Sequence, residues 1–393
     1  MKTSQLVSWI LLIGLGLPSS GQIVGPDTLI TKVLENNKTL KVARESYHVA
    51  LLEAGTGNTP PNPEIEVGYL FGYPSETGNR VDFSVSQQVD FPTTYIHKSR
   101  LKKIKSSRVE LDYIISRQEV LLLAHQLWIE RLHLNQQKQL LLERLNQAEV
   151  INEHFRQKLA SGEEGSLAFN QSVLKLAALQ NDFELIQAKI RNNQLALNEI
   201  SGGDEVTIHF KEFPPSMAIN SDSLLQAYRN SPELLLYMHE QQLKEEQKNL
   251  TVSQTLPKIT AGYYSESILD QQFKGIQVGV TVPLWQNANM IKKAKSEMIY
   301  AEADADRFTS LQRKEVLQKL DQLESTKTRV LNLAEALGSA KSMELLTLAL
   351  DSGEISLSEY FYASDFYFRN EQLLLQYKRD QLLLEAELLK VYL

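Results

Sequence analysis

The chain has 393 residues, a formal charge of −7 and no cysteine. The absence of cysteine excludes disulfides, a thiol nucleophile and a lipid carried on an N-terminal cysteine. The charge is spread over stretches of mixed sign, without a basic patch interleaved with aromatic residues, so nucleic acid is not an expected partner.

The first residues have the pattern of a secretory signal peptide. Lys2 precedes an apolar run from Leu6 to Leu17, which is too short for a membrane-spanning helix, and small residues follow it. We predict a signal peptide over residues 1–21; the alternative is a buried N-terminal helix. Beyond it, no run reaches the ~18 to 20 apolar residues of a transmembrane helix, so any membrane-embedded part must consist of strands.

The rest of the chain contains a tandem duplication. Residues 36–40 align with 230–234, and residues 63–69 with 257–263, both at an offset of 194. Two further pairs follow in the same order: 83–85 with 278–280, and 161–163 with 352–354. Four ordered anchors predict two copies of one structural repeat, 22–202 and 220–393, separated by an equatorial connector at 203–219.

Each copy is predicted to begin with a helix, at about 27–54 and 221–254, followed by a β-hairpin. Alternating apolar residues place the hairpins at 64–91 and 257–284. Strands of about 10 residues match the length of a tilted membrane-crossing strand. An open sheet in lipid leaves unpaired backbone groups that cost several kcal/mol each, so the four strands require further copies of the chain for closure. Two copies would supply eight strands and three would supply twelve, and the larger barrel leaves an open lumen.

A long helix is predicted after each hairpin, at 93–160 and 287–351. About 60 residues form a rod roughly 90 to 100 Å long. Apolar residues at seven-residue spacing indicate coiled-coil packing, and a second apolar row on another face indicates neighbours on both sides. The first row is Tyr113, Val120, Leu127, Leu134, Leu141 and Ala148, and the second is Ile115, Leu122 and Ile129.

Glycine turns end both rods, at Gly162 and Gly353, and return helices are predicted at 166–201 and 356–392. In the last helix Phe361, Phe368, Leu375, Leu382 and Leu389 recur every seven residues. Between the copies, residues 206–210 form a strand-like segment.

No catalytic, cofactor or metal site is predicted, and the chain is not expected to be an enzyme. The seven histidines form no pair at i, i+3 or i, i+4; His125 and His133 lie two helical turns apart. Gly55 and Gly57 lack the strand-to-helix setting of a nucleotide-binding loop.

The order helix, hairpin, long helix, glycine turn and helix, written twice, resembles the TolC-like outer membrane factor family over the whole chain after the signal peptide. Three segments carry the resemblance: 230–234 as a repeat opening, 280–284 as the end of the second hairpin, and 353–359 as a helix tip. The most similar branch is heavy-metal cation efflux, that of CusC and CzcC. The resemblance implies a mixed α+β membrane protein: a homotrimer with a twelve-stranded transmembrane β-barrel and a coiled-coil helical tunnel in the periplasm.

The resemblance also implies the site residues. In the family, acidic residues just after the second tip ring the closed periplasmic entrance. Glu359 falls on the first such position, but Tyr362 occupies the next, so a double acidic ring is not expected. The tips expected to dock a periplasmic adaptor protein contain Gly162, Ser166, Leu167, Gly353, Ser356 and Leu357.

The function implied is the outer-membrane channel of a tripartite efflux system driven by an inner-membrane RND pump. It would conduct heavy-metal cations or small toxic compounds out of the periplasm of a Gram-negative cell. A channel of a type I protein secretion system is the alternative within this architecture. A periplasmic coiled-coil scaffold or adhesin, whose hairpins pair in water, is the alternative of another class.

Overall fold

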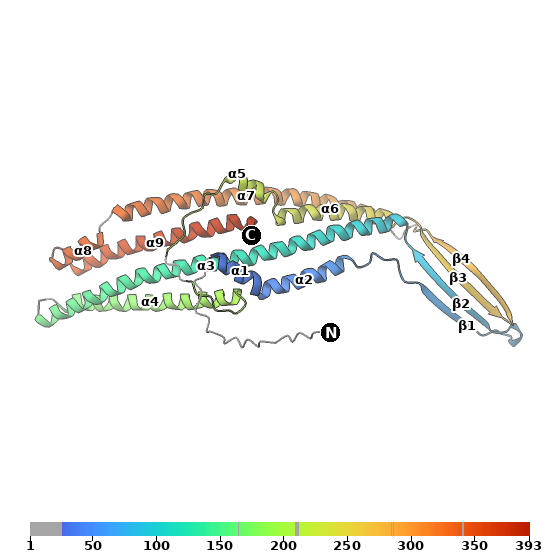
Figure 1. Cartoon of the computed structure of the whole chain (residues 1–393), viewed down its shortest axis with the longest axis horizontal. Coiled ribbons are helices and arrows are strands. Elements are labelled where there is room, and N and C mark those ends of the chain that lie inside the picture. The colour runs from blue at the N-terminus through green and yellow to red at the C-terminus, as the bar shows by residue number, and fades with distance from the viewer. Residues whose placement is uncertain (1–25, 164, 209–211, 284, 286, 340–341) are drawn as a thin grey trace, which may run out of the picture.

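The computed structural model describes residues 26–163, 165–208, 212–283, 285, 287–339 and 342–393. They form a long, curved molecule with a sheet at one end and helices running along the rest (Figure 1). The predicted signal peptide, residues 1–21, lies outside the described residues.

Each copy opens with a pair of helices rather than the single predicted helix. In the first copy these are α1 (Pro26–Asn36) and α2 (Lys38–Ala54), and in the second α5 (Ser221–Tyr228) and α6 (Pro232–Ser253). Both breaks fall at an N-cap. The Asn37 side chain accepts a hydrogen bond from the Leu40 N–H at 2.8 Å, and the Ser231 side chain accepts one from the Leu234 N–H at 3.2 Å. The aligned segments at 36–40 and 230–234 are therefore two copies of one helix cap.

Both predicted hairpins are confirmed. The first consists of β1 (Glu64–Leu70) and β2 (Arg80–Val89), joined through a short 3-10 turn, η1 (Ser75–Thr77). The second consists of β3 (Lys258–Ile268) and β4 (Gln271–Thr281), joined by Leu269 and Asp270, whose φ angles of 46° and 63° suit a tight hairpin turn. Strand β2 also pairs with β3, so the copies share one antiparallel sheet in the order β1-β2-β3-β4.

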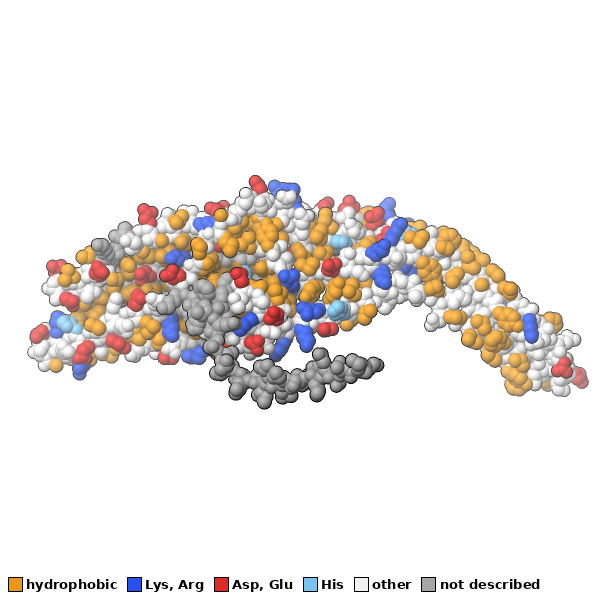
Figure 2. Space-filling view, in the orientation of Figure 1, with side chains coloured by type: hydrophobic (Ala, Val, Ile, Leu, Met, Phe, Trp, Pro, Cys, Tyr) orange, Lys and Arg blue, Asp and Glu red, His pale blue; other side chains and the backbone are white. Residues whose placement is uncertain are grey.

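The register gives this sheet one apolar and one polar face, because directly paired residues point the same way. Val67 pairs with Phe83, and Tyr263 pairs with Ile276. These side chains are exposed: Val67 by 73% and Ile276 by 86%. Hydrophobic side chains are visible over the strands in Figure 2. The polar face carries an ion-pair network of Arg80, Asp82, Tyr264 and Glu266.

The first long helix is confirmed as α3 (Pro92–Ser161), whose 70 residues make a rod of about 100 Å. The second is described as α7 (Met290–Ser339) and α8 (Ser342–Asp351), and Figure 1 shows α8 off the axis of α7; residues 340–341 between them lie outside the described residues. Gly338, in the last turn of α7, costs about 1 kcal/mol relative to alanine, which weakens the rod there. No helix within the described ranges is both long and apolar enough to cross a bilayer.

The return helices α4 (Ser166–Ile200) and α9 (Leu357–Leu389) lie along the rods, α4 against α3 and α9 against α7 and α3. The predicted row of apolar residues at seven-residue spacing is buried in the C-terminal half of α3. It extends to Phe155, which is 4% exposed. The largest apolar cluster lies midway along the molecule, where α1, α3, α4, α9 and the connector meet; it includes Leu29, Trp128, Leu197, Val206 and Leu382.

The connector does not form the predicted strand in its described part. Val206 and Ile208 bury their side chains in the cluster, and the backbone of Val206 bonds to side chains of α4. Gln194 donates to its carbonyl at 2.6 Å, and Asn198 accepts from its N–H at 3.2 Å. These side chains replace a neighbouring strand; residues 209–210 of the prediction lie outside the described residues.

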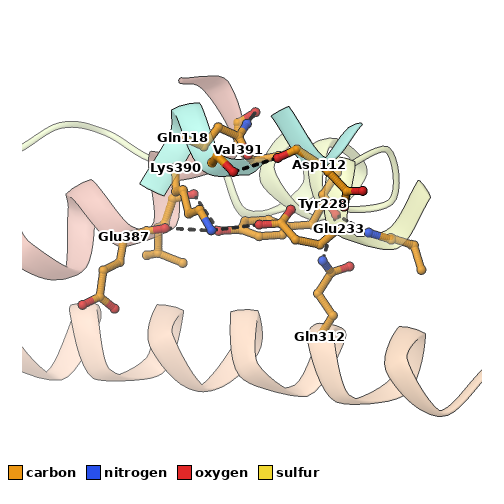
Figure 3. A network of polar contacts seen from close by, with 12 residues as sticks. Asp112, Gln118, Tyr228, Glu233, Gln312, Glu387, Lys390 and Val391 are labelled. Carbon is orange, nitrogen blue, oxygen red and sulfur yellow. Dashed lines mark hydrogen bonds and ion pairs between the residues drawn. The ribbon is translucent and has the colours of Figure 1, made fainter. Parts of the chain in front are cut away.

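The final turn η2 (Lys390–Tyr392) is held where α5 meets α6 (Figure 3). The Tyr228 hydroxyl donates toward the carbonyls of Glu387 and Leu388, both at 3.2 Å, and Lys390 Nζ lies 2.8 Å from Glu233 Oε1. Burial, aided by Glu233 and Glu387, raises the pKa of Tyr228 to about 12, so its hydroxyl stays a donor.

Candidate functional site

The predicted site lies at the end of the molecule opposite the sheet, where both helix pairs turn (Figure 1). In the first tip, Gly162 has φ 76° and ψ 14°, and the N–H of Glu163 bonds to the Lys158 carbonyl at 3.0 Å. This left-handed glycine cap closes α3. Ser166 begins α4, and the Leu167 side chain after it is 73% exposed.

The second tip has the same glycine turn, but the helix that follows it begins with a side-chain cap, which the helix after the first tip lacks. Gly353 has φ 73°, and the Glu354 N–H bonds to the Ala349 carbonyl at 2.9 Å. Ser356 then caps α9 in a capping box with Glu359. The Ser356 backbone N–H donates to Glu359 Oε2 at 2.8 Å, and the Glu359 N–H donates to Ser356 Oγ at 3.2 Å.

Glu359 therefore combines a capping role with an exposed charge. The hydrogen bond from the Ser356 backbone N–H, followed by that from its hydroxyl, lowers the pKa of Glu359 below its ordinary value. The carboxylate is therefore ionised at neutral pH, and it lies on the surface of the chain.

The two predicted tip leucines differ in environment. Leu357 is 4% exposed and packs in a cluster with Phe155, Leu350 and Tyr360, so it joins α9 to α3 and α8. Leu167 is on the surface. The aligned sequences suggested equivalent roles, but only Leu167 of this pair can contact another molecule without rearrangement.

Tyr362 lies on an apolar groove rather than among acidic groups. Its side chain is 81% exposed, and with Phe366, 66% exposed, it lines a hollow of about 760 Å³ between α7, α8 and α9. Leu337, Leu345 and Ile355 also line it. This position offers an apolar surface where the family pattern has a charge.

One polar cluster near the tips was missed by the sequence analysis. Asp365 Oδ1 lies 2.7 Å from Arg144 Nη2 on α3, and Asp365 Oδ2 lies 2.6 Å from Lys175 Nζ on α4. The Arg144 guanidinium also lies over the Phe368 ring, 4.7 Å from its centroid. Asp365 thus ties three helices together; its spacing in the sequence gives no sign of its partners.

The histidines do not gather into a site. No group of three or more His, Cys, Asp or Glu is placed to hold a metal ion among the residues that the structure describes. Burial, followed by repulsion from Arg379, lowers the pKa of His133 to about 4. His97 Nδ1 lies 2.6 Å from Glu246 Oε1, a contact between α3 and α6 near the sheet.

Solved structures share this fold at low sequence identity. The chain superposes on CusC, which forms a transmembrane channel, with a TM-score of 0.76 and 16% identity over 95% of each chain. The Campylobacter jejuni outer membrane channel CmeC gives 0.77 and 18% over 93% of this chain and 85% of CmeC. The Vibrio cholerae outer membrane protein VceC gives 0.78 and 14% over 93% of this chain and 95% of VceC. No protein-family model and no curated protein sequence matches the chain.

The chain therefore has the TolC-like outer membrane channel fold, mostly helical with a small sheet. The predicted resemblance is confirmed at the level of fold. CusC, CmeC and VceC are described as channel or outer membrane proteins.

Proposed function

We propose that this chain is the outer-membrane channel of a tripartite efflux system. The observation that carries the proposal is a sheet with an exposed apolar face and two unpaired edges, β1 and β4, on the end of helical rods about 100 Å long. An apolar sheet of this kind is stable in lipid once its edges are paired. The rods then extend away from the membrane into the periplasm.

Closure by three copies fits this geometry best. Four strands per chain fall short of the roughly eight that the smallest closed barrels need, and twelve leave an open lumen. Pairing of β4 with β1 of the next copy would satisfy both edges. A neighbouring copy would also cover the apolar groove at Tyr362 and Phe366.

The tips are the proposed docking surface for the periplasmic adaptor, which links the channel to an inner-membrane RND pump. Gly162, Ser166 and Leu167 in the first tip, and Gly353 and Ser356 in the second, are exposed. Buried Leu357 contributes by fixing the shape of the second tip. Alanine or charged replacements of Leu167 should weaken adaptor crosslinking and leave assembly of the channel unchanged.

The proposed cargo is heavy-metal cations or small toxic compounds. Residues 342–368, which contain the second tip, carry five Asp or Glu and no Lys or Arg; Asp365 is paired with Arg144 and Lys175, which leaves four carboxylates. An acidic entrance raises the local concentration of cations. Identity to CusC, at 16%, does not exceed that to CmeC, at 18%, so the acidic tip is the argument for metal cargo. A type I protein secretion channel is the second candidate.

Fractionation tests the channel itself. The protein should separate with the outer membrane, require detergent for extraction and run as an oligomer in SDS. Extraction by salt or buffer alone would support the periplasmic scaffold instead.

Metal tolerance tests the cargo. A deletion strain should become sensitive to copper, zinc, cobalt or cadmium and regain tolerance when this chain is restored. Unchanged tolerance, together with copurification of a protein-exporting pump, would favour the secretion channel.

A further inference from the structure

We propose that lysines directly below the sheet form a ring that binds anionic phospholipid headgroups of the leaflet facing the helices. The basic collar, as we call it, consists of Lys102, Lys103 and Lys105 on α3 and Lys292, Lys293 and Lys295 on α7. The proposal rests on the proposed function, because it requires the sheet to lie in a membrane.

The collar carries a high density of unpaired positive charge. Residues 97–108 contain six Lys or Arg and no Asp or Glu, and two of the six, Lys98 and Arg100, lie within ion-pair distance of Asp90 and Glu246. All six collar lysines are exposed. Within the described ranges only Lys293 has a carboxylate within ion-pair distance, Glu297 at 3.6 Å, and its own side chain is 79% exposed. By contrast Arg108, further along α3, is paired with Glu240.

The collar lies at the depth of a headgroup layer. Helix α3 starts at Pro92, just after β2 ends at Val89, and α7 starts at Met290. At about 1.5 Å per residue, Lys292 to Lys295 lie roughly 3 to 8 Å along α7, and Lys102 to Lys105 roughly 15 to 20 Å along α3. A headgroup layer is about 5 to 8 Å thick, and the Debye length adds about 8 Å more. The lysines of α7 therefore lie within the headgroup layer, and those of α3 lie at the limit of its electrostatic reach, which is about 13 to 16 Å.

The placement of Lys292 and Lys293 works against the helix that carries them. A helix N-terminus disfavours positive charge, yet α7 carries Lys292 and Lys293 in its first turns and no acidic residue in its first turn. Helices α2 and α6 end beside the same sheet, where cations would be favourable, and their last turns carry none. An external anion would remove this unfavourable interaction.

Large apolar side chains accompany the collar, and they favour a lipid over a soluble anion. Trp285 is 80% exposed, and Ile96 and Phe91 at the start of α3 are 53% and 37% exposed. Tryptophan beside lysine is the composition of a membrane interface. In Figure 2, Lys and Arg side chains gather over the helices next to the sheet, on the same viewed face as hydrophobic side chains over the strands.

The duplication makes the collar a ring. Each copy of the repeat places three lysines in the part of its long helix nearest the sheet, so a trimer would carry six such groups around the tube. The opposite end has the reverse charge, since residues 342–368 carry no Lys or Arg. The lysine collar near the sheet and the acidic second tip therefore lie at opposite ends of the helices.

The test compares the lipids retained by the purified full-length oligomer in mixed micelles of phosphatidylglycerol and phosphatidylcholine. At 0.15 M salt we expect phosphatidylglycerol to be enriched at least about tenfold, since each basic residue near an anionic surface contributes roughly a fivefold preference. The triple variants K102Q/K103Q/K105Q and K292Q/K293Q/K295Q should each lower the enrichment severalfold. In 1 M salt the enrichment should disappear.

The matched control, K189Q/R313Q/K314Q, removes three exposed cations far from the sheet and should retain the enrichment. Absence of enrichment in the unmodified protein, or an equal loss in the control, would overturn the proposal. Displacement of the lipid by millimolar glycerol phosphate would also overturn it, by showing a site for free phosphate. If one triple variant fails to form the SDS-resistant oligomer, the enrichment measured for the other triple variant and across the salt series decides whether the collar binds anionic headgroups.

Failure of this inference is distinguishable from failure of the proposed function. If the protein fractionates with the outer membrane but shows no headgroup preference, only the collar proposal is overturned. If the protein is absent from the outer membrane, both the collar proposal and the proposed function are overturned.

Discussion

At the scale of single residues, Glu359 shows how one carboxylate can serve both structure and transport. Its Oε2 accepts the Ser356 N–H and hydroxyl, which starts α9, and the charge stays on the surface. Glutamine also fits the last position of a capping box. The charge can therefore be removed while the cap is kept.

Replacement of Glu359 with Gln should lower the cation selectivity of single channels in planar bilayers and leave thermal stability nearly unchanged. The matched variant Ser356→Ala keeps the charge but loses the cap, at a cost of about 1 kcal/mol. It should retain selectivity and melt earlier. Equal conductance and selectivity in the Gln variant and the unmodified channel would remove Glu359 from the gate.

His133 predicts a specific loss of stability in acid. Its pKa is about 4 in the folded chain and ~6.5 in an unfolded one. At pH 7 both states are neutral; as the pH falls from about 6.5 to 4, only the unfolded state gains the proton. The folded state should lose up to roughly 3 kcal/mol per chain over this window.

A His133→Gln variant should show a shallower fall in melting temperature between pH 6.5 and 4 than the unmodified protein. His239, a partly exposed histidine on α6, is the matched control, and His239→Gln should leave the slope unchanged. Parallel melting curves for His133→Gln and the unmodified protein would contradict the assignment.

At the scale of helices, Asp365 holds the end of α9 against α3 and α4. Arg144 has only 11% of its side chain exposed, so removing its carboxylate leaves a charge that water solvates poorly. Such a loss costs about 1 to 3 kcal/mol, whereas exposed ion pairs contribute little.

Asp365→Asn should therefore lower the melting temperature and increase proteolysis at the tips. Glu153→Gln breaks an exposed ion pair with Arg156 on the surface of α3 and should change neither measurement. A stable, protease-resistant Asp365→Asn protein would show that packing around Phe368 alone holds α9.

At the scale of the whole molecule, the face of the sheet decides between a membrane channel and a scaffold in water. Ile276 lies on the apolar face and pairs with Tyr263 on the neighbouring strand. Gln277, the next residue, lies on the polar face and pairs with Gly262. A lysine facing lipid near the bilayer centre costs about 2 to 4 kcal/mol per copy, and a lysine facing a lumen costs little.

Ile276→Lys should therefore abolish the SDS-resistant oligomer in the outer membrane, while Gln277→Lys should assemble and alter conductance. Both proteins would be examined by fractionation and by gel mobility without heating. Tolerance of lysine at both positions would favour strands paired in water.

Much of the fold could be predicted because its signals are local and repeated. Alternating residues predicted the four strands, and seven-residue rows predicted α3. The helix breaks at Asn37 and Ser231 were missed although the repeated segments contained the caps, because the apolar pattern continues across them. Within the candidate site, the glycine turns were predicted correctly; the different burial of Leu167 and Leu357 was not.

By itself the sequence determined the two hairpins, the first long helix and the glycine turns at the tips. These follow from spacing along the chain and from backbone preferences of single residues. Only the tertiary structure decided that β2 pairs with β3, that Asp365 meets Arg144 and Lys175, and that α8 leaves the axis of α7. Such contacts join residues far apart in the sequence, and residue spacing within one segment does not specify its distant partners.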